Sequence, residues 1–546
     1  MRRAIGGLMT ALVLSGCMVG PDYRRPEVAV PSDFRGATPQ AAQDARSFGD
    51  LEWWKVFQDE QLQALIRTAL EQNYDLRVAA QRILQARSQV VIARSFQFPT
   101  ADLAVAAPYD RQTGENKTPN YETFLPQGGA SLAWELDLWG RFRRATEAAR
   151  ADLLATEDFQ RTVVLTLISD VARTYFTLRE LDLELDISRQ TLATRADYLR
   201  LTKAREEGGV ATLLDVRQAE QLYFSAAATI ADVQRSIEQQ ENLISILIGK
   251  YPEAIPRGSP LMKQPLVLSP AVPPGLTSDL LARRPDILQA EQQLVSANAR
   301  IGAAKALLFP SVVISGFAGA GGAVVNGSSF GPFGAFNALP TITLPVFNMG
   351  RLSANVDFNE ARTQEALLRY QQAIQQAFGE VADALVGVRK RKEVREQNEA
   401  TVAAQRDALR LSSMRYEGGV TSFLEVLVTE RDLFDAELLL ARAWRDEILS
   451  FVQLYKALGG GWQTETPPLA PTATTEPRPQ DVGSAAAENL SVSSEDSAGA
   501  PAGRLSAAAE RAANGPGSGS GGPAAGGGDD TIWGKVKAFF GSLFSR

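Results

Sequence analysis

The sequence predicts a mainly α-helical protein with a transmembrane β part, arranged as two tandem repeats that each hold two strands and a long helical hairpin. Three observations predict this fold class. A segment of the first half returns 210 residues later, each half contains a long stretch without proline, and a stretch of alternating apolar and polar residues precedes each of these. Period-two alternation is typical of strands, and a long proline-free stretch is typical of a helix.

The internal repeat fixes the expected domain boundaries. Arg205–Val216 recurs as Arg415–Val426, and Glu220 recurs as Glu430, all at an offset of 210. We divide the chain into a lipoprotein signal peptide (1–16), an N-terminal anchor and equatorial segment (17–72), repeat 1 (73–250), an inter-repeat linker (251–283), repeat 2 (284–460), a disordered low-complexity tail (461–530) and an amphipathic C-terminal helix (531–546).

The N-terminus has the layout of a signal peptide, with arginines at positions 2 and 3 before an apolar run, Ala4–Leu14. This run is too short to remain as a membrane-spanning helix. The tetrad Leu14–Cys17 resembles a bacterial lipobox, so we expect cleavage after residue 16 and attachment of an S-diacylglycerol and an N-acyl chain such as palmitate to Cys17. Met18 follows, rather than the aspartate that commonly retains such proteins at the inner membrane, which favours the cell outer membrane. The alternative is an incidental or buried cysteine.

Each repeat is predicted to open with one helix and to close with a helical hairpin. The opening helices, Asn73 to about Ala93 and Pro285 to about Leu308, end before Phe-Pro pairs. The first arms of the hairpins, Gly140–Glu207 and Gly350–Glu417, contain no proline and are far longer than the helices of an ordinary globular domain. The return helices after the Gly-Gly-Val turns are expected at Ala211–Ile248 and Thr421–Leu458.

The regions between these helices, Pro99–Asp137 and Pro310–Phe347, are expected to supply two strands each. Their loops are expected at Gly114–Tyr121 and Asn326–Gly334, where glycine, proline and asparagine gather. The apolar faces are expected at Leu103, Val105 and Ala107, at Ala130, Leu132, Trp134 and Leu136, and at Ile342, Leu344 and Val346.

Strands that cross a membrane must form a closed sheet, because lipid offers no partner to an open backbone edge. Four strands per chain cannot close alone, since barrels of this kind start at about eight strands. Two chains would give a barrel filled by side chains, and three would leave a lumen, so a homotrimer is the smaller assembly that makes a pore. The alternative is a soluble β-subdomain at the end of a coiled-coil rod.

The composition excludes several classes of function. Lys and Arg number 56 against 63 Asp and Glu, and the net charge of −7 argues against a partner nucleic acid. Histidine is absent and cysteine occurs once, which excludes histidine-based catalysis, imidazole metal sites, intrachain disulfides and thiolate zinc sites. The sequence also has no phosphate-binding glycine loop. We therefore expect no enzyme activity, no metal and no cofactor.

A set of motifs between about residues 14 and 460 carries a resemblance to one known family. The motifs are Gly16–Pro26, Trp53-Trp54 with Phe57, Asn73–Leu76, Trp134–Arg141, Arg283–Ile287, Leu344–Phe347 and the two Gly-Gly-Val turns. They resemble the outer-membrane factor family, the TolC-like channels, and most closely its NodT/OprM-like efflux lipoproteins. The resemblance implies a trimer with a twelve-stranded β-barrel in the outer membrane, a periplasmic α-barrel and an equatorial collar of smaller elements.

The resemblance also implies a function. It is that of a passive exit duct for drugs or other small molecules in a tripartite efflux system. Such a duct docks with a periplasmic adaptor, the membrane fusion protein, and with an inner-membrane pump, usually of the resistance-nodulation-division (RND) type. The pump supplies the energy, and we expect it to supply most of the selectivity.

Two groups of residues receive roles from the resemblance. The periplasmic tips that meet the adaptor would be Gly208, Gly209, Val210, Gly418, Gly419 and Val420, although the geometry of a helix C-terminus by itself accounts for one glycine in each turn. The gate candidates are Asp215, Leu424, Glu425, Val428 and Arg431.

Within this gate, Glu425 falls where related channels carry a constriction carboxylate, and Asp215 is its counterpart in repeat 1. Leu424 would form an apolar ring, and Arg431 is expected to pair with a tip carboxylate. Val428 departs from the family, since relatives often have an aspartate there. The alternative for Glu425 is a solvated acid at a helix start.

The tail lies outside the resemblance. Gly515–Gly528 is nearly pure linker, and the last sixteen residues combine aromatic and basic side chains in a pattern suited to a membrane interface or a partner groove. Two further functions remain open for the whole chain: a channel for type I secretion, which shares the fold, and a lipid-anchored structural coiled-coil protein without a pore. A glycan hydrolase is disfavoured, because the acidic residues are spread along helix faces.

Overall fold

The computed structural model describes residues 18–35, 47–112, 121–264 and 277–461. All of them belong to the first of the two units into which the chain divides, Met1–Ala473. The predictions for Cys17, for the signal peptide, for the tail and for most of the loop at 114–121 therefore lie outside the described residues.

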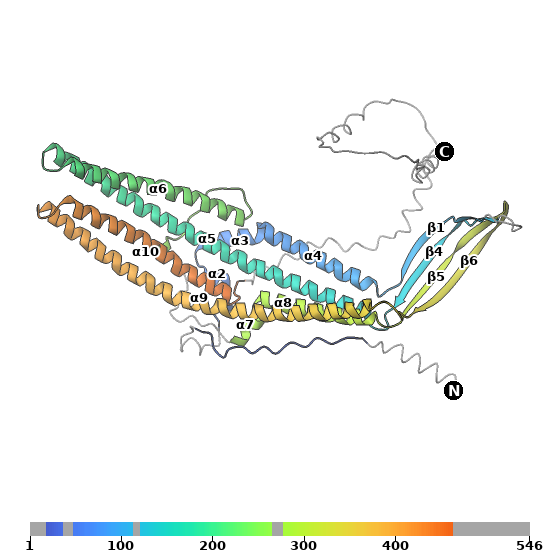
Figure 1. The fold of residues 1–546 in the computed structure, drawn as a ribbon. Coiled ribbons are helices and arrows are strands. Elements are labelled where there is room, and N and C mark those ends of the chain that lie inside the picture. Colours follow the sequence, from blue (N-terminus) through green and yellow to red (C-terminus); the bar gives the residue numbers. More distant parts are fainter. Residues whose placement is uncertain (1–17, 36–46, 113–120, 265–276, 462–546) are drawn as a thin grey trace, which may run out of the picture. The chain divides into compact units, whose positions relative to one another are not determined.

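Six long helices confirm the predicted helical pattern (Figure 1). In repeat 1 they are α4 (Tyr74–Ser95), α5 (Arg141–Glu207) and α6 (Leu213–Leu247). In repeat 2 the corresponding helices are α8 (Pro285–Ala306), α9 (Arg351–Glu417) and α10 (Phe423–Ala457). None of the helices in the described part of the chain has the length and apolarity needed to cross a lipid bilayer.

The offset of 210 also holds in space. Gly140 and Gly350, which precede α5 and α9, both have positive φ, 77° and 79°, a conformation that glycine adopts without strain. Asp137 accepts hydrogen bonds from the backbone N–H groups of Phe142 and Arg143 (3.2 and 2.9 Å) and so satisfies free donors in the first turn of α5. In repeat 2 the side chain of Asn348 accepts from the Leu352 N–H (3.3 Å), so the two repeats share the glycine and differ in the residue that caps the first turn.

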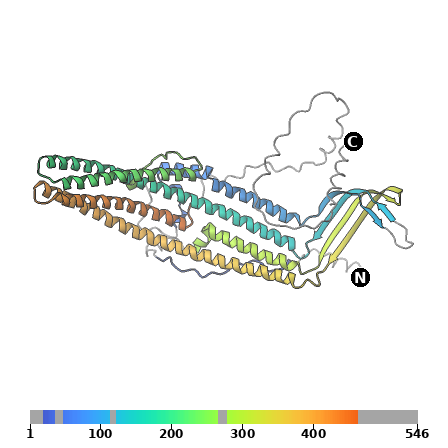
Figure 2. The same ribbon diagram turned by 45° about the horizontal axis from the view of Figure 1, so that its top comes forward.

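The helices form one layer in which α5 is central (Figures 1 and 2). On the side of the helical turns, α6 packs on α5, α5 on α10, and α10 on α9. On the side of the strands, α4 packs on α5, α5 on α8, and α8 on α9. The outer members of the layer are thus α6 and α4 at one edge and α9 at the other.

The main apolar core lies where α5 and α10 meet the shorter elements. Trp53, Phe57, Tyr175, Phe176 and Tyr455 are among its fully buried side chains. Phe57 and Tyr455 pack edge to face at 6.0 Å, which joins the N-terminal segment to the end of repeat 2. The shorter elements are η2 (Phe48–Asp50), α2 (Trp53–Val56), α3 (Glu60–Gln72), η3 (Leu261–Lys263) and α7 (Thr277–Arg283).

The strands form one antiparallel sheet. The strands β1 (Thr100–Ala106) and β2 (Tyr109–Gln112) pair with β4 (Gln127–Leu136) and β3 (Tyr121–Phe124), respectively. Both β4 and β3 pair with β5 (Ser311–Val325), which also pairs with β6 (Ser328–Thr343). Because β1 continues into β2 and β3 into β4, the sheet is four strands wide, as predicted. Its free edges are β1 with β2 on one side and β6 on the other.

Several predicted strand limits are wrong. The loop expected at Asn326–Gly334 is only a turn at Asn326 and Gly327, and β6 begins at Ser328. Pro332 favours a loop at this point of the sequence, but an edge strand tolerates proline because one of its sides has no ladder bonds to lose. Tyr121 lies in β3, Ala107 lies beyond β1, and Leu344 and Val346 lie beyond β6.

Residues 18–25, which we call the N-terminal strap, lie along α5 and α8. The Val19 N–H donates to the Trp139 carbonyl (3.1 Å), and the buried Arg144 guanidinium donates to Asp22 (2.7 Å). Further bonds join Tyr23 and Arg25 to Glu291, and Asn298 to the Pro21 carbonyl. The strap therefore holds Met18 beside the junction between helices and strands.

Candidate functional site

The two helical turns have the same backbone. Gly209 and Gly419 both have φ of +73°, where a side chain would be strained. The Val210 N–H donates to the Arg205 carbonyl (2.8 Å), and the Val420 N–H donates to the Arg415 carbonyl (2.9 Å). These bonds, with those from the glycine N–H groups, form a Schellman motif that satisfies the last carbonyls of α5 and α9.

The tips are apolar and exposed. Val210 and Val420 are 74% and 73% exposed, and Leu213, Leu214 and Leu424 beside them are also exposed. Gly208 and Gly418 have ordinary helical φ values, so the backbone does not require glycine there. An exposed apolar group at the end of a long helical hairpin is typical of a surface that binds another protein.

At the first tip, Asp215 is used to start α6. Its carboxylate accepts hydrogen bonds from the Thr212 N–H and hydroxyl (both 2.8 Å), and its own N–H donates to the Thr212 hydroxyl (3.3 Å). This is a capping box. The geometry places Asp215 in the cap of its helix rather than free in front of the turn.

At the second tip, Glu425 joins the two sides of the turn. It accepts a hydrogen bond from Arg415 at the end of α9 (2.8 Å) and another from the Thr421 hydroxyl. The side chain of the cap residue Ser422 makes no bond to the helix backbone. Glu425 is therefore a paired carboxylate in this state of the chain.

The remaining gate candidates lie on the first turns of α10. Leu424 and Val428 are exposed, one turn apart. Arg431 donates to Asp432 (3.0 Å), and its pairing with a tip carboxylate stays a prediction. The structure thus gathers Leu424, Glu425 and Val428 near one turn and leaves Arg431 engaged elsewhere.

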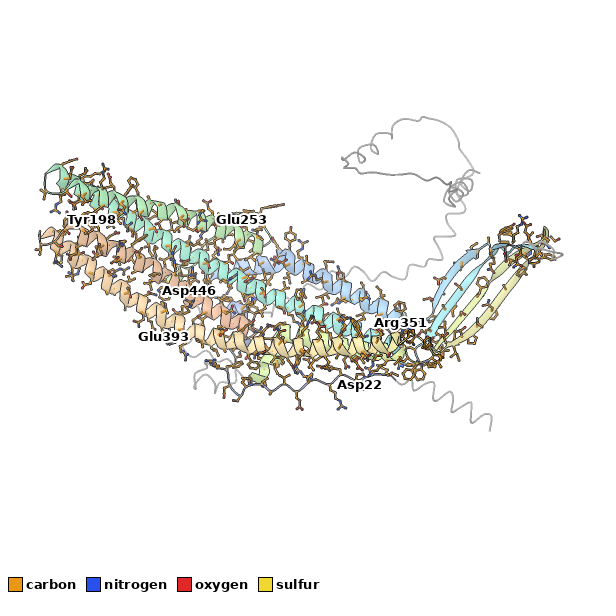
Figure 3. The ribbon with its side chains drawn as sticks, in the orientation of Figure 1. Asp22, Tyr198, Glu253, Arg351, Glu393 and Asp446 are labelled. Atoms are coloured by element: carbon orange, nitrogen blue, oxygen red, sulfur yellow. The ribbon has the colours of Figure 1, made fainter. Side chains whose placement is uncertain are left out.

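Aromatic contacts join the two hairpins near the tips. We call α5 with α6 hairpin 1 and α9 with α10 hairpin 2. Tyr198 of α5, which lies near the turn in Figure 3, packs against Phe423 (centroids 6.1 Å apart), and its hydroxyl lies 3.4 Å from that of Ser413. The Arg205 guanidinium lies over the Tyr416 ring (4.6 Å). These contacts hold hairpin 2 against hairpin 1.

A buried ion pair lies further from the tips in the same seam. The Arg195 Nε donates to both oxygens of Glu430 (3.0 Å each), and Nη1 donates to the Leu222 carbonyl of α6 (2.8 Å). The two charged side chains are only 3% and 6% exposed. Arg195 also lies over the Phe434 ring (5.0 Å). Burial raises the pKa of Glu430, and the guanidinium opposes that rise.

A second ionic group lies further along the seam between α5 and α10. Arg442 donates to Glu184 (2.7 Å), and Arg445 donates to Glu180 (3.1 Å). Burial and the neighbouring Glu184 carboxylate raise the pKa of Glu180 from 4.5 to about 7. Hairpin 2 is thus attached to hairpin 1 by charged pairs at two levels.

These seam residues were missed in the sequence. The recurrence of Glu220 as Glu430 is visible at the offset of 210, but nothing in the sequence distinguishes the half-buried copy from the buried one. No cluster of acidic or cysteine side chains in the described ranges has an arrangement that holds a metal ion.

Comparison with known proteins identifies the family. The model described as outer membrane efflux protein matches residues 65–250 and 276–460. The solvent efflux pump outer membrane protein SrpC of Pseudomonas putida is 37% identical over 472 residues, which are 83% of this chain and 97% of the relative. The cation efflux system protein CusC of Escherichia coli O157:H7 is 34% identical over 457 residues, 83% of this chain and 97% of that one.

A solved structure agrees with this. The open state of the MtrE outer membrane channel of Neisseria gonorrhoeae is similar at a TM-score of 0.71 and 34% identity, over 82% of this chain and 99% of that chain. The two matched segments contain both long helical hairpins and both tips described above. The resemblance inferred from the motifs is confirmed, and the chain belongs to the outer membrane efflux protein family.

Proposed function

We propose that three copies of this chain form an exit duct that crosses the outer membrane and continues into the periplasm. The observation that carries the proposal is that one chain leaves its sheet open at two edges, β1 with β2 and β6. An open edge is not tolerated in lipid. Four strands from each of three chains make a closed barrel wide enough to conduct.

The helical layer supports the same assembly. It ends at α6 and α4 on one side and at α9 on the other, and these outer helices carry exposed apolar side chains. Joining α9 of one copy to α6 and α4 of the next closes the layer into a tube. In this proposal the duct is passive, and the inner-membrane pump drives transport.

The partners proposed for the duct are a periplasmic adaptor and an inner-membrane pump of the RND type. The exposed valines and leucines of the tips, among them Val210, Val420 and Leu424, suit contact with the adaptor's helical hairpins. The relative SrpC is named as the outer membrane protein of a solvent efflux pump, and CusC is named as a protein of a cation efflux system. The exported compounds are small molecules that the pump delivers.

A lipid on Cys17 fits the position of the N-terminal strap. Met18 follows the cysteine directly, and a side chain on Gly140 would meet Met18, so the strap begins where α5 leaves the strands. If the strands cross the outer membrane, its inner leaflet ends at the level of this junction between strands and helices. Acyl chains on Cys17 would enter that leaflet without any further length of chain.

The gate proposed at the tips is formed by Leu424 and Glu425 from three copies. The three leucines would make an apolar constriction, and the three carboxylates would favour cations near it. In the chain described here, Arg415 partly neutralises Glu425. Release of that pair is therefore part of opening in this proposal.

Conductance of the purified, lipidated protein in planar bilayers tests the function. We expect trimer-sized particles that conduct, and we expect Glu425→Ala to change cation preference or the fraction of time spent open. Asp215→Ala is the matched control, because the counterpart of Glu425 in repeat 1 is engaged in its helix cap. Unchanged conductance in Glu425→Ala would remove this residue from the gate. Absence of trimers and of current would overturn the duct.

A further inference from the structure

The register of the sheet assigns each paired side chain to one of two faces. In antiparallel strands, residues directly opposite one another share a face, and the face changes at each step along a strand. One row across the four strands is apolar and consists of Leu103, Ala130, Ala318 and Phe336. The next row, on the other face, consists of Asp102, Ser131, Phe317 and Asn337.

The face that carries Leu103 is apolar over its whole paired length. Its members are the odd-numbered residues 101–105 of β1 and the even-numbered residues 128–136 of β4, 312–320 of β5 and 334–342 of β6. In a single chain, Leu103 and Val105 are each 90% exposed. Trp134 lies near the helical end of this face, and tryptophan is typical of a membrane–water interface. This face therefore meets lipid if the strands cross the membrane.

The opposite face holds the polar side chains of the same strands. They include Thr100, Gln127, Ser131, Ser315, Asn337 and Thr341. The two charged side chains of β1, β4, β5 and β6, Asp102 and Glu135, are also on this face. In a closed sheet whose other face lies in lipid, this polar face lines the lumen.

The two carboxylates of the polar face differ in their contacts. Glu135 accepts from Arg141 at the start of α5 (2.9 Å). Asp102 is exposed, and its carboxylate has no hydrogen bond or ion pair with any described residue of the chain. The neighbouring Ser131 hydroxyl donates to the backbone carbonyl of Asp102 (3.4 Å) rather than to its carboxylate. No cation of the same chain therefore offsets the charge of Asp102.

The wall beside Asp102 leaves the lumen wide. The next row on the polar face contains only small residues, which are Ala104, Gly129, Gly319 and Ala335. A side chain on either glycine would come within 2.8 Å of Cζ of Phe317. The Phe317 ring therefore lies along the wall, over the glycines, rather than across the lumen. Asp102 is thus placed to act on solutes through its electric field rather than by narrowing the path.

We infer that Asp102 from three copies forms a ring of negative charge in the outer-membrane part of the duct, and that this ring favours cationic over anionic solutes. The inference rests on the duct of the proposed function and adds a selecting residue to it. Charged rings select ions in other channels, and a wall of low dielectric constant strengthens the field of each charge. The 67 residues of α5 separate the ring from the tips, so it acts independently of the gate.

Leu103→Cys and Ala104→Cys test the assignment of the two faces. The chain has one other cysteine, Cys17, and wild-type protein labelled in parallel accounts for it. In trimers reconstituted into lipid vesicles, a water-soluble methanethiosulfonate reagent should modify Ala104→Cys and leave Leu103→Cys unmodified. Equal reaction at the two positions, or the reverse pattern, would overturn the inference.

The charge of Asp102 is tested at the same engineered cysteine. The rate of a trimethylammonium methanethiosulfonate divided by that of a sulfonate reagent reports the local potential, because the reactivity of the thiol cancels. Position 104 lies two residues from Asp102, about 7 Å along the strand. Asp102→Asn should lower the ratio about twofold at roughly 0.15 M salt and about fivefold at roughly 0.01 M, where screening is weaker. Asp102→Glu should preserve it. A ratio that Asp102→Asn leaves unchanged would overturn the ring.

Glu135→Gln is the matched control for loss of a carboxylate on the polar face. Glu135 lies six residues along β4 from Gly129, the partner of Ala104, and hence about 20 Å away. This distance exceeds the screening length of about 8 Å at physiological salt, so the ratio at Ala104→Cys should not change there. A fall as large as that caused by Asp102→Asn would show that the ratio reports the total charge of the duct, which would overturn the assignment to Asp102.

Reversal potentials in planar bilayers under a KCl gradient separate the inference from the proposed function. Asp102→Lys should shift the preference from K⁺ toward Cl⁻, and the same shift should appear in a Glu425→Ala background. Wild-type channels that conduct, with an unchanged reversal potential in Asp102→Lys, would overturn the ring and leave the duct. Absence of wild-type trimers and of current would overturn both.

Discussion

At the first tip, Asp215 closes a capping box with Thr212, whereas at the second tip its counterpart Glu425 binds Arg415 and Thr421 across the turn. The backbone of the two turns is the same, with φ of +73° at the second glycine of each. The two repeats therefore share the backbone of the turn, but the counterpart carboxylates have different hydrogen-bond partners. Hairpin 2 pairs Glu430, Arg442 and Arg445 with charged residues of hairpin 1. Their counterparts Glu220, Asp232 and Arg235 form ion pairs within hairpin 1.

The largest expected effect is at the buried ion pair between Arg195 of hairpin 1 and Glu430 of hairpin 2. Glu430→Ala leaves Arg195 buried without its carboxylate, which should cost about 3–5 kcal/mol in the local stability of α5 and α10. Hydrogen exchange of these helices measures the loss. Glu220→Ala, at the half-buried counterpart that pairs with Lys203 of α5 and Arg217 of α6, should leave exchange in α10 unchanged and have only a small effect on α5. Equal effects of the two substitutions would contradict the asymmetry between the hairpins.

A pH-dependent effect of intermediate size is expected at Glu180. Its pKa is raised from 4.5 to about 7, so between these values the folded chain holds a proton that the unfolded chain has released. Stability of the seam should therefore fall as the pH rises from 4.5 to about 7 and stay level above that, by a total on the order of 3 kcal/mol.

Glu180→Gln should abolish this dependence. The measurement is hydrogen exchange in α5 between pH 5 and 8, corrected for the intrinsic rate. A dependence that persists in the variant would assign the titration to another group, such as Glu184.

A smaller effect is expected at the turns, where the two repeats should behave alike. Gly209→Ala and Gly419→Ala each place a side chain at positive φ and should cost roughly 1–2 kcal/mol. Gly208→Ala is the control, because its φ of −78° is ordinary for a helix end. Thermal dissociation of the trimer and hydrogen exchange at the turns report the difference. If Gly208→Ala lowers the stability as much, then steric crowding, rather than backbone strain, accounts for the glycines.

The smallest expected effect concerns the N-terminal caps of α6 and α10, which differ. Thr212→Ala removes a cap bond and should cost about 1 kcal/mol in the stability of the first turn of α6. Ser422→Ala should cost almost nothing at the start of α10, because that side chain caps no backbone group. Hydrogen exchange of the first turns measures both. A loss in Ser422→Ala would mean that the second tip forms a cap in the assembled protein.

Helix limits were predictable because glycine and proline mark them. The predicted arms Gly140–Glu207 and Gly350–Glu417 differ from α5 and α9 by one residue, since Gly140 and Gly350 are the cap residues. Strand limits were less predictable, as β6 shows. It contains Pro332 and Pro340, which predict a break in a central strand but are compatible with an edge strand.

The site was predictable only in part. One glycine in each tip was predictable from the sequence alone, because a helix C-terminus often ends in a residue with positive φ. The partner of a charged side chain depends on which helix lies beside it, and a single sequence does not give this. Arg195 and Glu430 are separated by 235 positions, and only the packing of α5 on α10 brings them together. The role of Glu425 at a gate stays a prediction.

The N-terminal strap has a mechanical consequence. A side chain on Gly302 would come within 2.6 Å of the Val19 carbonyl oxygen, and a side chain on Gly20 would collide with Gly302, so the strap and α8 touch backbone to backbone. Together with the bond from Val19 to Trp139 and the pair between Arg144 and Asp22, this leaves the strap no slack. A force that acts on the strap at Met18 would therefore be transmitted to α5 and α8 through these contacts.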